Sequence, residues 1–78
     1  MIHKYLAYLK TIETGSITKA AAELGYTQSA VSRMIADLEE NWDVPLLTRN
    51  RNGIEISSEG MQLLPLLQAI VKGQDDLS

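Results

Sequence analysis

The sequence predicts a mainly α-helical domain with one short β-hairpin, and three observations lead to this fold class. Apolar residues recur at three- and four-residue steps along three stretches, and a fourth stretch is rich in alanine, which are patterns of helices. Two of these stretches are followed by glycines, Gly15 and Gly25, where a helix commonly ends in the left-handed conformation. Near the middle of the chain, the Asn52–Gly53 pair separates two short apolar segments, which indicates a hairpin.

Length and composition restrict the classes of protein to which the chain can belong. It has 78 residues, of which 45% are apolar and none is cysteine. A chain of this size buries only roughly 60% of the surface of its unfolded form, which leaves no volume for an internal catalytic cavity. No apolar run reaches the ~20 residues that span a bilayer, and the first residues lack the features of a signal peptide. We therefore expect one small cytoplasmic domain that is not an enzyme. With a single histidine, His3, and no cysteine, no metal site is predicted and no cofactor is expected.

The first two helices are predicted over Ile2–Thr14 and Ile17–Leu24. One face of the first collects five apolar residues: Ile2, Tyr5, Leu6, Leu9 and Ile12. The second helix contains three consecutive alanines, which favour a helix and add little bulk. Ser16 precedes it and is expected to be its N-cap, because a serine hydroxyl can accept a hydrogen bond from a free backbone N–H of the first turn.

A third helix is predicted to run from its N-cap, Thr27, to about Trp42. Its apolar stripe consists of Val31, Ile35, Leu38 and Trp42. The opposite face is small and polar, with Gln28 near its N-terminal edge, and carries Ser29, Ser32, Arg33, Ala36 and Glu40.

A hairpin and a last helix complete the prediction. The strands are expected at Leu46–Arg49 and Ile54–Ile56, around a polar turn over residues 50–53. Ser57 or Ser58 is expected to cap the last helix, in which Pro65 either produces a kink or lies close enough to the start to be tolerated. The apolar stripe of this helix exceeds what one shallow core requires, so we interpret it as a dimer seam: Leu63, Leu64, Leu67, Ile70 and Val71.

The second and third helices have the proportions of a helix-turn-helix, and the hairpin would then be a wing. A helix fits the major groove of DNA if its exposed face is not bulky and offers hydrogen-bonding groups near its N-terminus, here Gln28, Ser29, Ser32 and Arg33. Arg49 and Arg51 are placed to contact phosphates or the minor groove. The caps Ser16 and Thr27 would aim free backbone N–H groups at a nearby phosphate.

In four segments the sequence resembles the DNA-binding domain of LysR-type transcriptional regulators: Gly15–Leu24, Thr27–Glu39, Val44–Arg49 and Ser57–Gly60. The segments occur in the same order and at the same spacing, over nearly the whole chain. The resemblance implies sequence-specific binding of double-stranded DNA and control of transcription initiation in a bacterium. By position, it implies groove-facing roles for Thr18, Thr27, Gln28, Ser29, Ser32 and Arg33, and wing roles for Arg49 and Arg51.

The resemblance also implies a division of the chain and its partners. Residues 1–57 would form a winged helix-turn-helix, and residues 58–78 a linker helix that pairs antiparallel with a second copy to make a homodimer. Family members usually continue into a C-terminal domain that binds a small-molecule inducer, and a tetramer is a possible full-length assembly. We expect this chain to be an isolated or truncated DNA-binding domain without that inducer domain.

The charge of the chain supports a second hypothesis. Its net charge is −3, and four acids near the end of the third helix are interpreted as a solvated face: Asp37, Glu39, Glu40 and Asp43. Relatives often carry basic side chains at the positions of Ala36 and Asp37, so we expect fewer phosphate contacts and weaker non-specific binding here. The alternative function is a winged-helix module for protein interaction or dimerisation that has lost DNA binding. Retention on heparin or DNA at low salt distinguishes the two.

Overall fold

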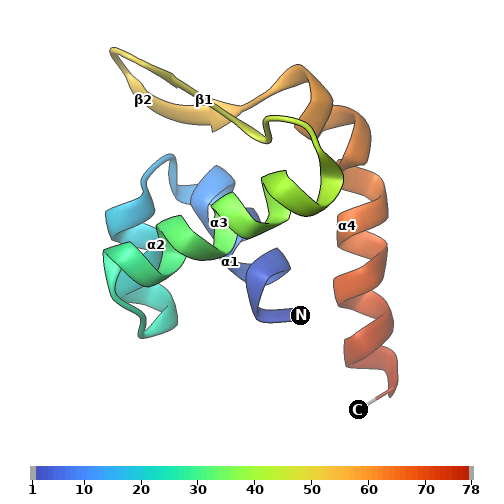
Figure 1. Cartoon of the computed structure of the whole chain (residues 1–78). Helices are drawn as coiled ribbons and strands as arrows, with labels where there is room; N and C mark the ends of the chain where they lie inside the picture. The colour runs from blue at the N-terminus through green and yellow to red at the C-terminus, as the bar shows by residue number, and fades with distance from the viewer. Residues whose placement is uncertain (1, 78) are drawn as a thin grey trace.

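The computed structural model describes the backbone of residues 2–77 and the side chains of residues 2–73. Within these residues, the elements in chain order are α1 (Ile2–Thr14), α2 (Ile17–Leu24), α3 (Gln28–Trp42), β1 (Leu47–Asn50), β2 (Gly53–Ile56) and α4 (Ser58–Leu77). The hairpin lies above α3 in Figure 1, and α4 runs down the side of the molecule opposite α2. The predicted fold class, a mainly α winged helix-turn-helix with a C-terminal helix, is confirmed.

Helix α1 lies at the centre of the fold, because it packs against α2, α3, α4 and β2. Its deepest residues are Ala7, Tyr8 and Thr11, which are fully buried. The predicted stripe lies at the margin of this core: Tyr5, Leu9 and Ile12 pack against it, whereas Leu6 is 37% exposed. When a helix has neighbours on several sides, the residues that face the place where those neighbours meet become buried. Ala7 leaves room for this approach, and the Thr11 hydroxyl is satisfied by donating to the Ala7 carbonyl at 2.8 Å.

Helices α2 and α3 begin at the predicted caps. The Ser16 hydroxyl accepts a hydrogen bond from the Lys19 N–H at 3.1 Å, and the Thr27 hydroxyl accepts one from the Ala30 N–H at the same distance. Gly25 ends α2 in the left-handed conformation, with φ 77°, as predicted. Both helices thus start on a hydroxyl that satisfies one N–H of the first turn and leaves others free.

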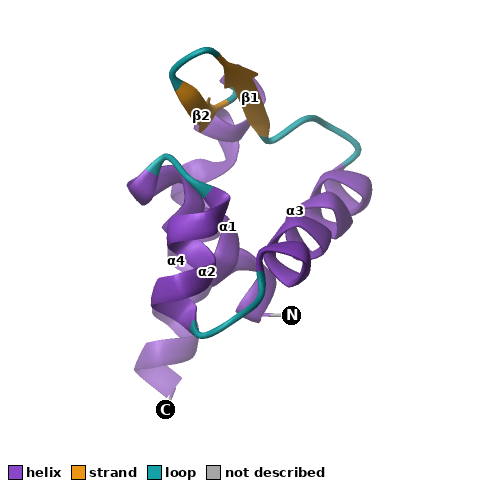
Figure 2. Ribbon diagram, turned by 90° about the vertical axis from the view of Figure 1, so that its left-hand side faces the viewer, coloured by secondary structure: helices purple, strands orange, loops and turns teal. Residues whose placement is uncertain are grey.

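The stripe predicted for the third helix forms the centre of the core. Val31, Ile35 and Leu38 are buried against residues from α1, α2 and α4, and Trp42 packs at the edge of this cluster. Figure 2 shows the first turn of α3 beside the loop that follows α2, and its last turn leading into the loop that enters β1. With one face of α3 in the core, its small polar face is left outside.

In the hairpin, β1 is shifted by one residue from the prediction, and β2 begins one residue earlier than predicted. Asn50 pairs with Gly53, so the turn consists of Arg51 and Asn52 rather than four residues. The Asn50 side chain accepts a hydrogen bond from the Asn52 N–H at 2.8 Å, which closes the turn. Gly53 belongs to β2 with φ 123°, and its missing Cβ lets the strand lie against the turn between α1 and α2.

Helix α4 is part of the same core. Ser57 is its cap, since its hydroxyl accepts from the Gly60 N–H at 2.9 Å. The helix continues through Pro65, which lies in its interior beyond the first turn. A side chain at Gly60 would overlap the Tyr8 hydroxyl, the Ile56 side chain and a backbone carbonyl, so glycine here allows α4 to approach α1 and the hairpin. No helix within residues 2–77 combines the length and hydropathy needed to cross a bilayer.

Candidate nucleic-acid interface

The N-terminal half of α3 presents the polar face that the sequence predicted. Gln28, Ser29 and Arg33 are exposed, and Ser32 is half-buried. Thr27 lies at the head of this face, with its hydroxyl 3.3 Å from that of Ser29. The structure therefore brings the predicted hydrogen-bonding groups together on one accessible turn and a half of helix. Thr18, also exposed, belongs to the first turn of α2.

Arg33 is the predicted base reader, and its side chain is 82% exposed. Its Nε–H donates to Oδ1 of Asp37 at 3.3 Å, one turn further along α3. The other carboxylate oxygen of Asp37 lies 3.2 Å from Nζ of Lys4, which comes from α1. The hydrogen bond from Lys4, with a further contribution from Arg33, holds the pKa of Asp37 below its usual value.

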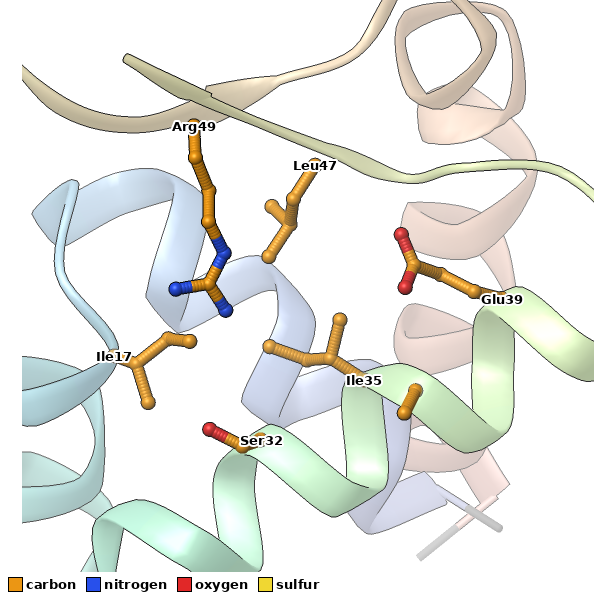
Figure 3. Close-up of a pocket in the computed structure, with 7 residues that line it drawn as sticks. Ile17, Ser32, Ile35, Glu39, Leu47 and Arg49 are labelled. Atoms are coloured by element: carbon orange, nitrogen blue, oxygen red, sulfur yellow. The ribbon is translucent and has the colours of Figure 1, made fainter. Parts of the chain in front are cut away.

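The wing faces α3 across a hollow of about 270 Å³. Figure 3 shows the Arg49 side chain reaching from β1 into this hollow, with its guanidinium directed towards Ser32 and Ile17. The walls of the hollow come from α2, α3 and β1: Ile17, Ser32, Ile35, Ala36, Glu39, Leu47 and Arg49. Arg49 thus belongs to the same surface as the polar face of α3. Arg51 is exposed in the turn at the end of the hairpin.

Glu39 holds the wing in place, which corrects its interpretation as part of a solvated acidic face. The side chain is half-buried, and one carboxylate oxygen accepts a hydrogen bond from the Leu46 N–H at 2.7 Å. The Leu46 carbonyl in turn accepts from the Tyr8 hydroxyl at 2.8 Å and from the Ser57 N–H at 3.2 Å. Both backbone groups of Leu46 are therefore bound, and the hairpin cannot move freely from α1 and α3. Helical periodicity places Glu39 one turn after Ile35, at the edge of the buried stripe, but it does not indicate which backbone group the carboxylate meets.

The buried hydroxyl of Tyr8 ionises at a higher pH than an exposed tyrosine does. Burial, with a smaller contribution from the charge of Glu39, raises the pKa of Tyr8 to about 12. The neutral hydroxyl therefore remains a hydrogen-bond donor throughout the physiological pH range, and its hydrogen bond to the Leu46 carbonyl does not depend on pH there.

The remaining acids of α3 also differ from the expected face. Asp37 is paired with two cations, and Asp43 takes the left-handed conformation, with φ 56°, to end the helix. Only Glu40 is a plain exposed acid on this helix. All these acids lie in the second half of α3 or just beyond it, while residues 28–35 carry the single charge of Arg33. The net negative charge is thus not spread over the polar face.

The stripe predicted as a dimer seam is divided by the fold. Leu67 is fully buried in the monomer, and Leu63 packs against the same core. Leu67 was therefore assigned wrongly, because α4 folds back on α1 and covers it. Leu64 lines a groove of about 340 Å³ between α1 and α4. Among its described side chains, up to residue 73, the large apolar ones that α4 exposes are Met61 and Leu66, at 63% and 48%.

Comparison with known sequences gives one family. Residues 2–61 match the sequence profile described as "Bacterial regulatory helix-turn-helix protein, lysR family". The uncharacterized HTH-type transcriptional regulator YvbU of Bacillus subtilis (strain 168) is 42% identical over 67 residues, which are 85% of this chain and 23% of YvbU. The chain spans 17% to 23% of the length of the first curated relatives that it matches.

Solved structures show the same fold. The protein in the CbnR_DBD–DNA complex superimposes with a TM-score of 0.90 and 25% identity, over 97% of this chain and 87% of that one. The protein in the complex of BenM_DBD with catB site 1 DNA superimposes with a TM-score of 0.89 and 26% identity, over 99% of this chain and 86% of that one. Both crystal structures contain DNA.

Proposed function

The chain belongs to the LysR family of bacterial helix-turn-helix regulators, and from this premise we propose that it is the sequence-specific DNA-binding domain of a transcriptional regulator. The observation that supports this most strongly is the close fit, over nearly its whole length, to two domains crystallised on DNA. The polar face of α3 and the wing supply the chemistry that such binding needs. The domain acts by binding and not by catalysis, in the cytoplasm where bacterial DNA lies.

Helix α3 enters the major groove with its N-terminal half. A guanidinium can donate two parallel hydrogen bonds to guanine, and a glutamine amide can pair with adenine. Arg33 and Gln28 are exposed on this half of the helix and carry these groups. Ser29 and Ser32 add short donors that let the helix approach the bases. Thr18 faces the groove from the first turn of α2.

The wing and the helix N-termini bind phosphates. Arg49 already faces Ser32 across the hollow beside α3, so a phosphate lying there meets both the wing and the helix. Arg51 reaches the flanking backbone or the minor groove from the end of the hairpin. The first turns of α2 and α3, behind Ser16 and Thr27, add free backbone N–H groups at their positive helix ends.

The regulator works as a homodimer whose contact is α4, with residues 1–57 reading one half-site and residues 58–78 joining the copies. Because Leu67 is buried within the monomer, the surface for a second copy centres on Met61 and Leu66, flanked by Leu64, Ile70 and Val71. A dimer of this kind places two recognition helices at half-sites about one or two helical turns apart. Any inducer and any tetramer belong to further domains of the regulator.

Fluorescence anisotropy tests the proposal. The domain is titrated into a labelled duplex from the region upstream of its own gene and into a scrambled duplex, across a range of salt concentrations. We expect tighter binding to the upstream duplex, with log affinity falling linearly as log salt rises. A folded protein that binds neither duplex would overturn the proposal and favour the protein-interaction module.

Two arginine variants separate base reading from phosphate binding. Arg33→Ala should weaken binding to the preferred duplex by about 1–3 kcal/mol and reduce discrimination. Arg51→Ala should weaken binding to all duplexes alike and reduce the salt slope by about one. Equal losses for Arg33→Ala on both duplexes would contradict the assignment of Arg33.

A further inference from the structure

Arg33 does not extend freely from α3, because one carboxylate binds it from the same helix. Its Nε–H donates to Oδ1 of Asp37 at 3.3 Å, which leaves the two terminal nitrogens of the guanidinium without a partner among the described residues. These two nitrogens form the end of the planar fork that matches the acceptor pair of guanine. A side chain held at Nε samples fewer rotamers, so less order has to be imposed when it meets a base.

Asp37 is itself held by a second element. Its other oxygen lies 3.2 Å from Nζ of Lys4 on α1, and the carboxylate side chain is only 31% exposed. Lys4 therefore fixes the orientation of Asp37 and compensates its charge, so that the triad of Lys4, Asp37 and Arg33 carries a net charge of +1. The lowered pKa of Asp37 agrees with a carboxylate that stays ionised and paired.

We propose that Asp37 is a positioning residue that sets the base specificity of Arg33, by holding the guanidinium through Nε with its terminal nitrogens directed outwards. This inference rests on the proposed function and goes one step further. By repulsion alone, an acid at this place should only weaken DNA binding, but here it also determines which sequence the protein prefers. The two effects of Asp37 have opposite signs in different measurements. Its charge lowers affinity for every duplex, whereas its hydrogen bond raises the preference for one base.

The test uses Asp37→Asn and a matched control, Glu40→Gln. Both substitutions remove one negative charge from the second half of α3 and keep a side chain of similar size. Glu40 is exposed and makes no ion pair within the described residues. Repulsion alone therefore predicts the same result for both variants, and only the positioning role predicts a difference.

Each protein is incubated with a library of duplexes randomised over a stretch long enough for two half-sites, and the bound duplexes are sequenced. Arg33→Ala identifies the base pair that Arg33 reads. At that base pair, we expect the wild-type preference for guanine, roughly tenfold or more for a good bidentate contact, to fall at least about threefold in Asp37→Asn. Glu40→Gln should keep the wild-type preference. Both variants should bind a scrambled duplex more tightly than the wild type does.

The outcomes separate this inference from the proposed function. A wild-type protein without any base preference overturns both. A wild-type preference that Arg33→Ala leaves intact overturns the role of Arg33 and, with it, that of Asp37. A preference that disappears in Arg33→Ala but persists both in Asp37→Asn, whose amide oxygen can still accept from Nε, and in a second variant, Asp37→Ala, which removes the acceptor, overturns the positioning role alone. Circular dichroism of each variant shows whether a loss of preference is instead a loss of fold.

Discussion

The hydroxyl of Tyr8 joins α1 to Leu46, the residue before β1, and its removal in Tyr8→Phe should have opposite effects at neutral and at high pH. At pH 8 the variant loses the hydrogen bond to the Leu46 carbonyl. A typical net value for such a bond is about 1 kcal/mol. The loss should not exceed this value, because the Leu46 carbonyl keeps a second donor in the Ser57 N–H.

At high pH the wild type should become the less stable protein. The folded pKa of Tyr8, about 12, lies above the value of 10.0 in the unfolded chain, so the proton is bound more tightly in the folded state. The corresponding stability is fully present below pH 10 and is lost as the pH rises towards 12. Two pH units set an upper limit of about 3 kcal/mol on this loss. Tyr8→Phe has no hydroxyl to ionise and lacks this loss, so the two stability curves should cross between pH 10 and 12.

Urea unfolding followed by the fluorescence of Trp42 measures both effects. Trp42 is the only tryptophan and packs against the core, so its emission reports global unfolding. Tyr26→Phe is the matched control: the Tyr26 hydroxyl lies at an exposed contact, 3.2 Å from Nδ1 of His3, and its removal should have little effect on stability at pH 8. Parallel stability curves for the wild type and Tyr8→Phe up to pH 12 would refute the reasoning.

Five further substitutions test the packing of the wing and of α4. Gly60→Ala should destabilise the fold by about 1–3 kcal/mol through overlap, whereas Gly73→Ala, with open space around the new Cβ, should stabilise it by about 0.5–1 kcal/mol; thermal unfolding of both variants gives the sign. Glu39→Ala should cost about 1–3 kcal/mol by leaving a backbone N–H of the wing unpaired, and hydrogen exchange in the hairpin should rise; unchanged exchange would contradict this. In dilute protein, Leu67→Ala should lower the free energy of unfolding by about 2–5 kcal/mol, while Leu66→Ala should change it by no more than about 0.5 kcal/mol. A loss for Leu67→Ala as small as that for Leu66→Ala would place α4 outside the monomer core.

The elements that sequence reasoning located well are those whose signals are local. Ser16, Gly25 and Thr27 mark helix ends through their own hydroxyls or backbone freedom, and each is found at the predicted place. The stripe of α3 follows helical spacing and is buried as expected. Such features depend on residues three or four positions apart, so they can be read without knowing which elements meet.

Sequence reasoning failed where several elements meet at one residue. Leu6 belongs to the predicted apolar face of α1 but is exposed, while Thr11, which is not among the residues of that face, is fully buried, because α1 is covered from several sides. Glu39 was interpreted as solvated, yet it binds Leu46, the residue before β1, seven positions away. No periodic pattern encodes a contact of this kind.

The order of residues alone therefore determines the four helices, the hairpin, the caps of α2 and α3, and the small polar face that the N-terminal half of α3 leaves outside the core. Only the tertiary structure decides that Leu67 is covered by the monomer, that Arg49 turns towards Ser32, and that Asp37 lies between Arg33 and Lys4. The physical reason is the range of the interactions. Caps and helical faces arise between neighbours in the chain, whereas the pairing of Asp37 with Lys4 exists only once α1 and α3 have packed.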